Sequence, residues 1–225
     1  INVSSALART HRRTLDFNLP SRYVLVSTSL TPSTYNCTSH LTFPLFHSDY
    51  APNQTRFPQS QRTILLSFKG KSYDDVQHHR TFFRHLHNNH DIIIKYTDNT
   101  TNPDQTEYIQ LLLQSDFCLV PTGRRLSSYR FLETLQYACI PVITSNENET
   151  LLLPFSELID WPTCAIMYIN QPLTLLPRHL RQIDQFQRQI MQRTCFNIWF
   201  EYFSSIETIV LTALDILNQR FSLHS

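Results

Sequence analysis

Short apolar runs and helix-like stretches alternate through the middle of the chain. Four runs have the length and the polar flanks of buried strands, at 63–67, 92–96, 117–120 and 140–144. Apolar residues recur at helical spacing in the stretches between them, at 74–88, 106–114 and 128–139. Strands that alternate with helices predict an α/β fold with a doubly wound parallel sheet.

The two ends of the chain follow other patterns. Before the alternation we expect a helix at 3–13 and short strands at 23–26 and 41–46. After it, residues 180–221 are mostly helical in pattern. The stretch 48–61 is rich in Pro, Asn, Gln and Ser, which is typical of a linker. We therefore expect four parts: a separate lobe at 1–47, the linker 48–61, a sheet-bearing lobe at 62–200 and a C-terminal helix at 201–225.

A basic loop follows the predicted strand at 117–120. It contains Gly123 and Arg124. A predicted helix comes directly after the loop, and we expect Ser127 or Ser128 to begin that helix. In open α/β sheets, ligands bind at the carboxyl ends of the strands. The N-terminus of a helix also offers unpaired N–H groups and a positive dipole end to phosphate. This loop therefore indicates an anion site, with Ser128 at its edge.

Arg130 and Glu133 lie three residues apart, so they share one face near the start of that helix. The planar fork of an arginine suits a diphosphate, and a carboxylate one turn later can accept hydrogen bonds from two ribose hydroxyls. An ordinary ion pair on a solvated helix is the alternative, and the preceding Gly-Arg-Arg loop favours the nucleotide site. The helix residues expected to face the core are Phe131, Leu132, Leu135, Ala138 and Cys139.

Glycine is scarce, with two in 225 residues against roughly 16 at average usage. One is Gly123. The other is Gly70, between Lys69 and Lys71, just after the predicted strand at 63–67. We expect both glycines in loops after strands, where a missing side chain permits close approach of a ligand. One anionic ligand held between these two basic loops is the resulting hypothesis.

Net charge and the lengths of the apolar runs give little information about the class of function. The net charge is +1, which gives no argument for nucleic acid or for a membrane surface. No apolar run reaches the length of a membrane span. The chain starts within a predicted helix and shows no signal peptide, so we expect it to begin inside a longer protein.

Glycosylation acceptors indicate a compartment. Sequons without a central proline occur at Asn2, Asn36, Asn53, Asn99 and Asn148. They favour the lumen of the secretory pathway. Of the five cysteines, Cys118 and Cys139 lie in apolar contexts and are expected as buried thiols. The odd count leaves at least one cysteine unpaired within the chain.

Metal chemistry finds little support. His85 and His87 are two apart on a predicted helix, so they point to different faces, which is poor zinc geometry. The chain also lacks an Asp-X-Asp pair, the usual holder of a metal-bound nucleotide-sugar. For the aromatic run at 199–203 we expect packing in the core rather than stacking on a sugar.

Several motifs together resemble the exostosin domain of glycosyltransferase family 47, from about residue 40 to the end. They are Phe68-Lys-Gly-Lys71, Phe117-Cys-Leu-Val-Pro121, Gly123-Arg-Arg-Leu126, Tyr129-Arg-Phe-Leu-Glu-Thr-Leu-Gln136, Cys139-Ile-Pro-Val142, Leu153-Pro-Phe-Ser-Glu-Leu-Ile-Asp-Trp161 and Trp199-Phe-Glu-Tyr-Phe-Ser-Ser-Ile-Glu207. The resemblance implies a GT-B fold, with the nucleotide bound by the C-terminal lobe and residues 1–47 ending the N-terminal, acceptor-side lobe.

The family's activity would be inverting transfer of glucuronic acid from UDP-glucuronate to a terminal N-acetylglucosamine of a growing heparan sulfate chain. The resemblance implies neither a metal nor another cofactor. It assigns the diphosphate to Arg130 and the ribose to Glu133, with Gly123 and Arg124 shaping the loop. Lys69 and Lys71 match the family's second basic loop. Ser72 replaces an arginine that usually follows, so Arg80 is a candidate to take over that phosphate contact.

Two readings of the function stay open. Arg130 and Glu133 are kept, which favours an active glucuronyltransferase subunit. Ser72 and the short N-terminal lobe favour a catalytically silent partner that stabilises another exostosin and binds the heparan chain. Because no N-acetylglucosaminyltransferase domain follows Ser225, we expect a hetero-complex with a second exostosin-family protein. Its place would be the Golgi or endoplasmic reticulum lumen, anchored to the membrane by a segment outside this chain. The sequence identifies neither the general base nor the acceptor-binding residues.

Overall fold

The structure is a computed structural model. It describes residues 24–47, 56–58, 61–71, 82–97, 105–122, 126–145 and 151–222. The helix expected at 3–13 lies outside these ranges, as does most of the helix expected at 74–88. Within that second stretch, residues 83–86 form a short 3-10 turn, η2 (Phe83–Leu86).

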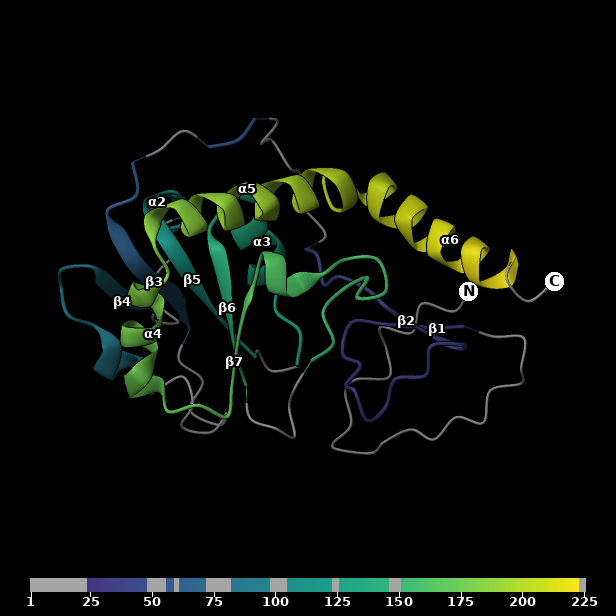
Figure 1. The fold of residues 1–225 in the computed structure, drawn as a ribbon, viewed down its shortest axis with the longest axis horizontal. Helices are drawn as coiled ribbons and strands as arrows, with labels where there is room; N and C mark the ends of the chain where they lie inside the picture. The colour runs from purple at the N-terminus through teal and green to yellow at the C-terminus, as the bar shows by residue number, and fades with distance from the viewer. Residues whose placement is uncertain are drawn as a thin grey trace.

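Five parallel strands form the central sheet, in the spatial order β4-β3-β5-β6-β7 (Figure 1). Their bounds are Ile64–Lys71 for β3, Ile92–Thr97 for β4, Ser115–Pro121 for β5, Ile140–Ser145 for β6 and Ile166–Ile169 for β7. The predicted parallel sheet is therefore confirmed. The chain runs outward from β3 to β4 and then returns past β3 to β5. The strand order reverses between β3 and β5, and such a switch point is where open α/β sheets bind ligands.

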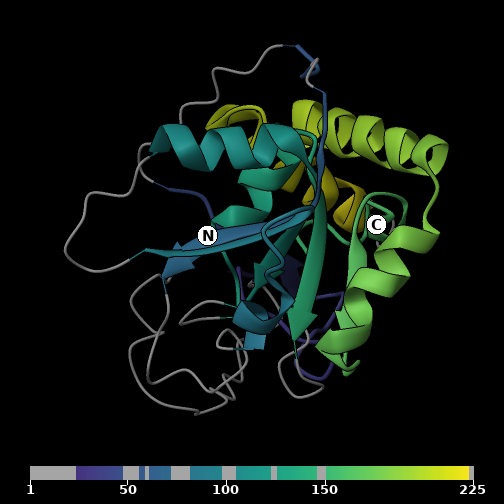
Figure 2. The ribbon, with the colours of Figure 1, turned by 90° about the vertical axis from the view of Figure 1, so that its left-hand side faces the viewer.

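Helices cover both faces of the sheet, as a doubly wound fold requires. Figure 2 shows α2 on one side of the strands and α4 on the other. The short α3 packs against α5 and β6. The helices are α2 (Gln105–Gln114), α3 (Arg130–Gln136), α4 (Leu176–Gln182), α5 (Gln185–Tyr202) and α6 (Ile206–Ser222), with 3-10 turns η4 (Trp161–Thr163) and η5 (Leu173–Leu175).

The strands at the centre of the sheet are buried on both faces. Phe117 and Leu119 of β5 and Val142 of β6 are all fully shielded from solvent. This burial explains why these strands appear in the sequence as continuous apolar runs rather than as alternating patterns. Two aromatic residues of the run at 199–203 join the core: Trp199 and Phe203 are buried, and Phe203 stacks on Phe155 with ring centroids 5.4 Å apart.

A second, two-stranded parallel sheet pairs β1 (Leu25–Ser27) with β2 (His40–Thr42). It lies below α6, at the end of the molecule away from β3 and β4 (Figure 1). Arg220 of α6 is bonded to the carboxylate of Glu157 and donates to the carbonyl oxygen of His40 at 2.8 Å, which ties this sheet to the C-terminal helix. The division into a separate lobe at 1–47 and a linker at 48–61 stays a prediction, because much of both ranges lies outside the described residues.

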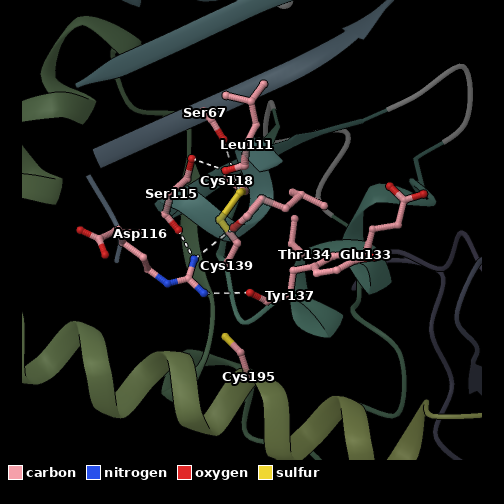
Figure 3. Close-up of a disulfide and its surroundings, with 12 residues drawn as sticks. Ser67, Leu111, Ser115, Asp116, Cys118, Glu133, Thr134, Tyr137, Cys139 and Cys195 are labelled. Carbon is pink, nitrogen blue, oxygen red and sulfur yellow. Dashed lines mark hydrogen bonds between the residues drawn. A yellow bond between two sulfur atoms is a disulfide. The ribbon is translucent and has the colours of Figure 1, made fainter. Parts of the chain in front are cut away.

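Two disulfides link the core elements. Cys118 of β5 bonds to Cys139, just before β6 (Figure 3), and Cys164 bonds to Cys195 of α5. Cys118 and Cys139 are buried as expected, but the expectation that they stay thiols was wrong. Strands β5 and β6 pair with Cys118 opposite Pro141, which brings the two cysteine Cα atoms within 5.9 Å, a distance that a disulfide spans.

Candidate functional site

Arg130 and Gly70 meet at the switch point of the sheet. Arg130 is the first residue of α3, and its guanidinium donates a hydrogen bond to the backbone carbonyl of Lys69 in β3. The guanidinium also lies over the ring of Phe68, 4.5 Å from its centroid. Two basic segments singled out in the sequence are therefore in direct contact. They are residues 69–71 and the start of α3.

Gly70 makes this contact possible. A Cβ atom on Gly70 would lie 2.7 Å from Nη2 of Arg130, closer than carbon and nitrogen normally approach. The glycine is inside β3 rather than in a loop, which corrects the sequence expectation. Parallel pairing with β4 continues past it to Lys71, opposite Thr97, so the backbone stays extended. Close approach, and not a left-handed backbone, is what favours glycine here, because an added Cβ would force the end of the Arg130 side chain to shift.

Tyr108 of α2 lies between Arg130 and Glu133. Its hydroxyl donates a hydrogen bond to Oε2 of Glu133, and the guanidinium of Arg130 is 5.6 Å from the centroid of its ring. Burial raises the pKa of Tyr108 above that of an ordinary phenol, and the charge of Glu133 adds to this, so the hydroxyl stays a neutral donor. The expected shared face of Arg130 and Glu133 is confirmed by this common neighbour. No motif in the sequence marks Tyr108, because a tyrosine in a helix of this kind is ordinary until its neighbours are known.

The Nε atom of Arg130 is buried and has no hydrogen-bond partner among the described residues. A buried donor without a partner costs free energy, and such groups in native proteins call for an explanation. An acceptor on a bound ligand would offset that cost.

The side chain of Lys69 is held inside the protein. It is 7% exposed and forms an ion pair with Glu107 of α2, which also pairs with Lys95 of β4. Hydrogen bonds from Lys69 and then from Lys95 lower the pKa of Glu107. Lys71, two residues on, is exposed at the end of β3. Of the two lysines predicted to meet phosphate, Lys71 is the one on the surface.

The serines before α3 do not cap it. The helix begins at Arg130, and the residue at its N-cap, Tyr129, makes no capping hydrogen bond with its side chain. Ser127 instead contacts Thr28 and Ser29, with hydroxyl oxygens 3.4 Å apart in each case. The helix expected at 128–139 is seven residues long, and it ends in a turn where Ala138 has a positive φ of 53°. The expectation that Ser127 or Ser128 opens the helix is thus wrong, although the predicted core residues of this segment are all buried.

Several predicted residues lie outside the described ranges: Arg80, Gly123, Arg124, Asn2, Asn53, Asn99 and Asn148. Ser128 is described and partly exposed, next to the start of α3. Within the described ranges, no three His, Cys, Asp or Glu side chains form a group that could hold a metal ion. Over the same residues, no helix is both long enough and apolar enough to cross a membrane.

The fold places the chain among doubly wound α/β proteins, which bind ligands at the edge where Arg130 and Gly70 meet. Comparison with known proteins is more specific. Residues 1–183 match the exostosin GT47 domain. The chain belongs to this exostosin family, which confirms the resemblance seen in its sequence motifs.

The relatives include exostosin-1 proteins. Exostosin-1a of Danio rerio is 34% identical over the whole of this chain and 34% of its own length. Exostosin-1 of Bos taurus is 38% identical over 72% of this chain and 24% of its own length. Exostosin-1 of Drosophila melanogaster is 35% identical over 80% of this chain and 27% of its own. The chain thus spans 24–34% of the length of these relatives.

Among solved structures, a chain from a crystal structure of the GtfA/B complex is similar, with a TM-score of 0.46 and 10% identity. The similarity covers 81% of this chain and 40% of that chain.

Proposed function

We propose that residues 62–200 of this chain are the nucleotide-binding lobe of an inverting GT-B glycosyltransferase. The reaction would transfer glucuronic acid from UDP-glucuronate to a terminal N-acetylglucosamine of a growing heparan sulfate chain. Membership of the exostosin family supports the reaction class. The observation that carries the proposal is the contact between Arg130 and the Lys69–Gly70 backbone at the switch point of the sheet.

Each residue of this cluster has a chemical task in the proposal. The guanidinium of Arg130 binds the diphosphate, and its unpartnered Nε supplies one donor. Glu133 accepts hydrogen bonds from the ribose hydroxyls, while the hydroxyl of Tyr108 holds that carboxylate in place. The ring of Phe68 packs against the guanidinium of Arg130 and fixes the orientation of its plane. Cationic groups fixed before the reaction stabilise the charge that develops on the leaving UDP.

The titration of UDP against Arg130→Ala tests this site. Loss of charge-assisted hydrogen bonds should weaken UDP binding by roughly 1.5–3 kcal/mol. The matched control is Arg178→Ala, which removes an exposed arginine on α4 and should leave UDP affinity unchanged. Equal UDP affinity in wild type and Arg130→Ala, with an intact fold, would remove Arg130 from the site.

The second candidate is a catalytically silent subunit that stabilises a partner exostosin and binds the heparan chain. Its support is the ion pair of Lys69 with Glu107, which occupies one of the two lysines assigned to phosphate. A transfer assay separates the two candidates. An active subunit moves glucuronic acid onto an acceptor that ends in N-acetylglucosamine, whereas a silent one binds the chain without turnover.

The setting of the proposed enzyme is the Golgi or endoplasmic reticulum lumen. Two disulfides support an oxidising compartment. We propose a stable hetero-complex with a second exostosin-family protein, which supplies the alternating N-acetylglucosamine, and an anchor outside this chain. Long alternating polymer made by this protein purified alone would argue against that partner.

A further inference from the structure

We infer that Asn36 is a site of N-linked glycosylation on the folded protein. The sequon Asn36-Cys37-Thr38 lies in the connection between β1 and β2, and all three residues are exposed. Of the five sequons it is the one inside the described ranges.

The side chain of Asn36 forms an Asx turn with Thr38. Its Oδ1 accepts hydrogen bonds from the backbone N–H of Thr38 at 3.0 Å and from the Thr38 hydroxyl at 2.7 Å. The backbone N–H of Asn36 donates to Nδ1 of His40 at 3.1 Å, which fixes the base of the turn. Both bonds to the side chain reach its oxygen, and within the described part of the chain nothing accepts from Nδ2. The nitrogen that carries the sugar is therefore left available.

This arrangement fits the chemistry of the transfer. The co-reactant is an oligosaccharide linked through its anomeric carbon to a lipid diphosphate. Nδ2 forms a bond to that carbon, the bond from the carbon to the diphosphate oxygen breaks, and the lipid diphosphate leaves with the electron pair. Nδ2 loses one proton to the transferring enzyme. The Thr38 hydroxyl, by donating to Oδ1, draws electron density from the amide and makes an Nδ2 proton easier to lose.

Two features of the molecule are compatible with a glycan at this position. The turn forms between residues two apart in sequence, so the chain can adopt it before the fold is complete. The small sheet lies at the end of the molecule opposite β3 and β4, so a glycan there leaves the switch point open (Figure 1). The inference rests on the turn and on the disulfides, which indicate an oxidising compartment, and not on the proposed transfer activity.

Peptide mapping of the protein purified from the secretory pathway of eukaryotic cells tests the site. Peptide N-glycosidase converts a glycosylated asparagine to aspartate, so mass spectrometry of the wild-type peptide reads occupancy directly. We expect Asp at position 36 in most of the treated protein. Asn36→Gln and Thr38→Ala should each remove one glycan from the intact mass, whereas Thr38→Ser and Cys37→Ser, which keep the sequon, should retain it.

Asn218→Gln is the matched control, because Asn218 is an exposed asparagine on α6 that is not part of a sequon. It should leave the intact mass of the glycoprotein unchanged except for the substitution. An unmodified Asn36 peptide from wild-type protein of the secretory pathway overturns the inference, whether or not other sequons are occupied. The wild-type measurement decides this even if a variant fails to fold. UDP titration of the same sample tests the proposed function separately.

Discussion

At the scale of single residues, the absence of a side chain at Gly70 shapes the candidate site. The guanidinium of Arg130 occupies the space that a Cβ would take, and Phe68 supports it from below. The close approach of two residues distant in sequence is therefore linked: any larger residue at position 70 would require the end of the Arg130 side chain to shift. The scarcity of glycine in the chain makes its presence here more informative.

Gly70→Ala should therefore act on UDP through Arg130. The added methyl group would lie 2.7 Å from Nη2 of Arg130, so the end of this flexible side chain must shift away from its contact with the β3 backbone. We expect about tenfold weaker UDP binding together with a small loss of stability in urea unfolding. Ser67→Ala, in the same strand, is the control and should leave UDP affinity as it is. A Gly70→Ala protein that binds UDP like wild type would show that Arg130 has room to move.

At the scale of elements, Arg62 joins the ends of two helices to the sheet. Its guanidinium donates to the carbonyl oxygens of Leu112 at the end of α2, Ser115 in β5 and Tyr137 after α3. Carbonyls at the end of a helix lack partners within the helix and carry the negative end of its dipole, so a cation suits them. Burial lowers the pKa of Arg62 to about 10, which leaves it charged at neutral pH. Both helices that carry site residues are positioned in this way.

Arg62→Met should destabilise the fold while preserving the bulk of the side chain. Loss of the guanidinium leaves buried carbonyls unsatisfied, each at a cost of roughly 1–3 kcal/mol. We expect the free energy of unfolding in urea to fall by at least about 2 kcal/mol. Arg178→Met, which removes an exposed arginine, should change it by less than about 0.5 kcal/mol. Equal losses in the two variants would contradict the assigned role of Arg62.

The disulfides also act between elements, since each closes a loop that contains part of the sheet. In the native protein without reductant, a thiol reagent should modify Cys37 alone, because the other four cysteines are paired and Cys37 is exposed. After reduction and unfolding, all five cysteines should react. Native alkylation at Cys118 or Cys139 would refute the pairing.

Removal of the Cys118–Cys139 bond should lower the free energy of unfolding by about 3 kcal/mol, as expected for a loop of about this length.

At the scale of the whole molecule, the proposed reaction depends on fixed cations. If Arg130, Lys71 and the residues near them meet the charge of the leaving UDP, transfer of glucuronic acid should continue in excess chelator. The measurement is the rate of transfer to an acceptor that ends in N-acetylglucosamine, with and without chelator. Activity lost on chelation and restored by a divalent cation would assign the leaving-group charge to a metal instead.

Much of the architecture was predictable because local patterns and burial agree. The central strands are covered on both faces, so each appears as an apolar run, and their alternation with helices implies a parallel sheet. The shared face of Arg130 and Glu133 followed from helical spacing. The sequon at Asn36 was equally visible, because the turn that forms there is local.

Tertiary structure alone decided which residues distant in sequence touch. Tyr108 and Arg62 have no sequence signal, and nothing in the sequence pairs Lys69 with Glu107, because these contacts join residues 25 to 75 positions apart in the chain. Strand register decided that Cys118 and Cys139 form a disulfide rather than stay as thiols. Sheet pairing with β4 likewise decided that Gly70 lies within a strand. The sequence determined the elements through local burial and periodicity, whereas long-range packing decided the geometry of the site.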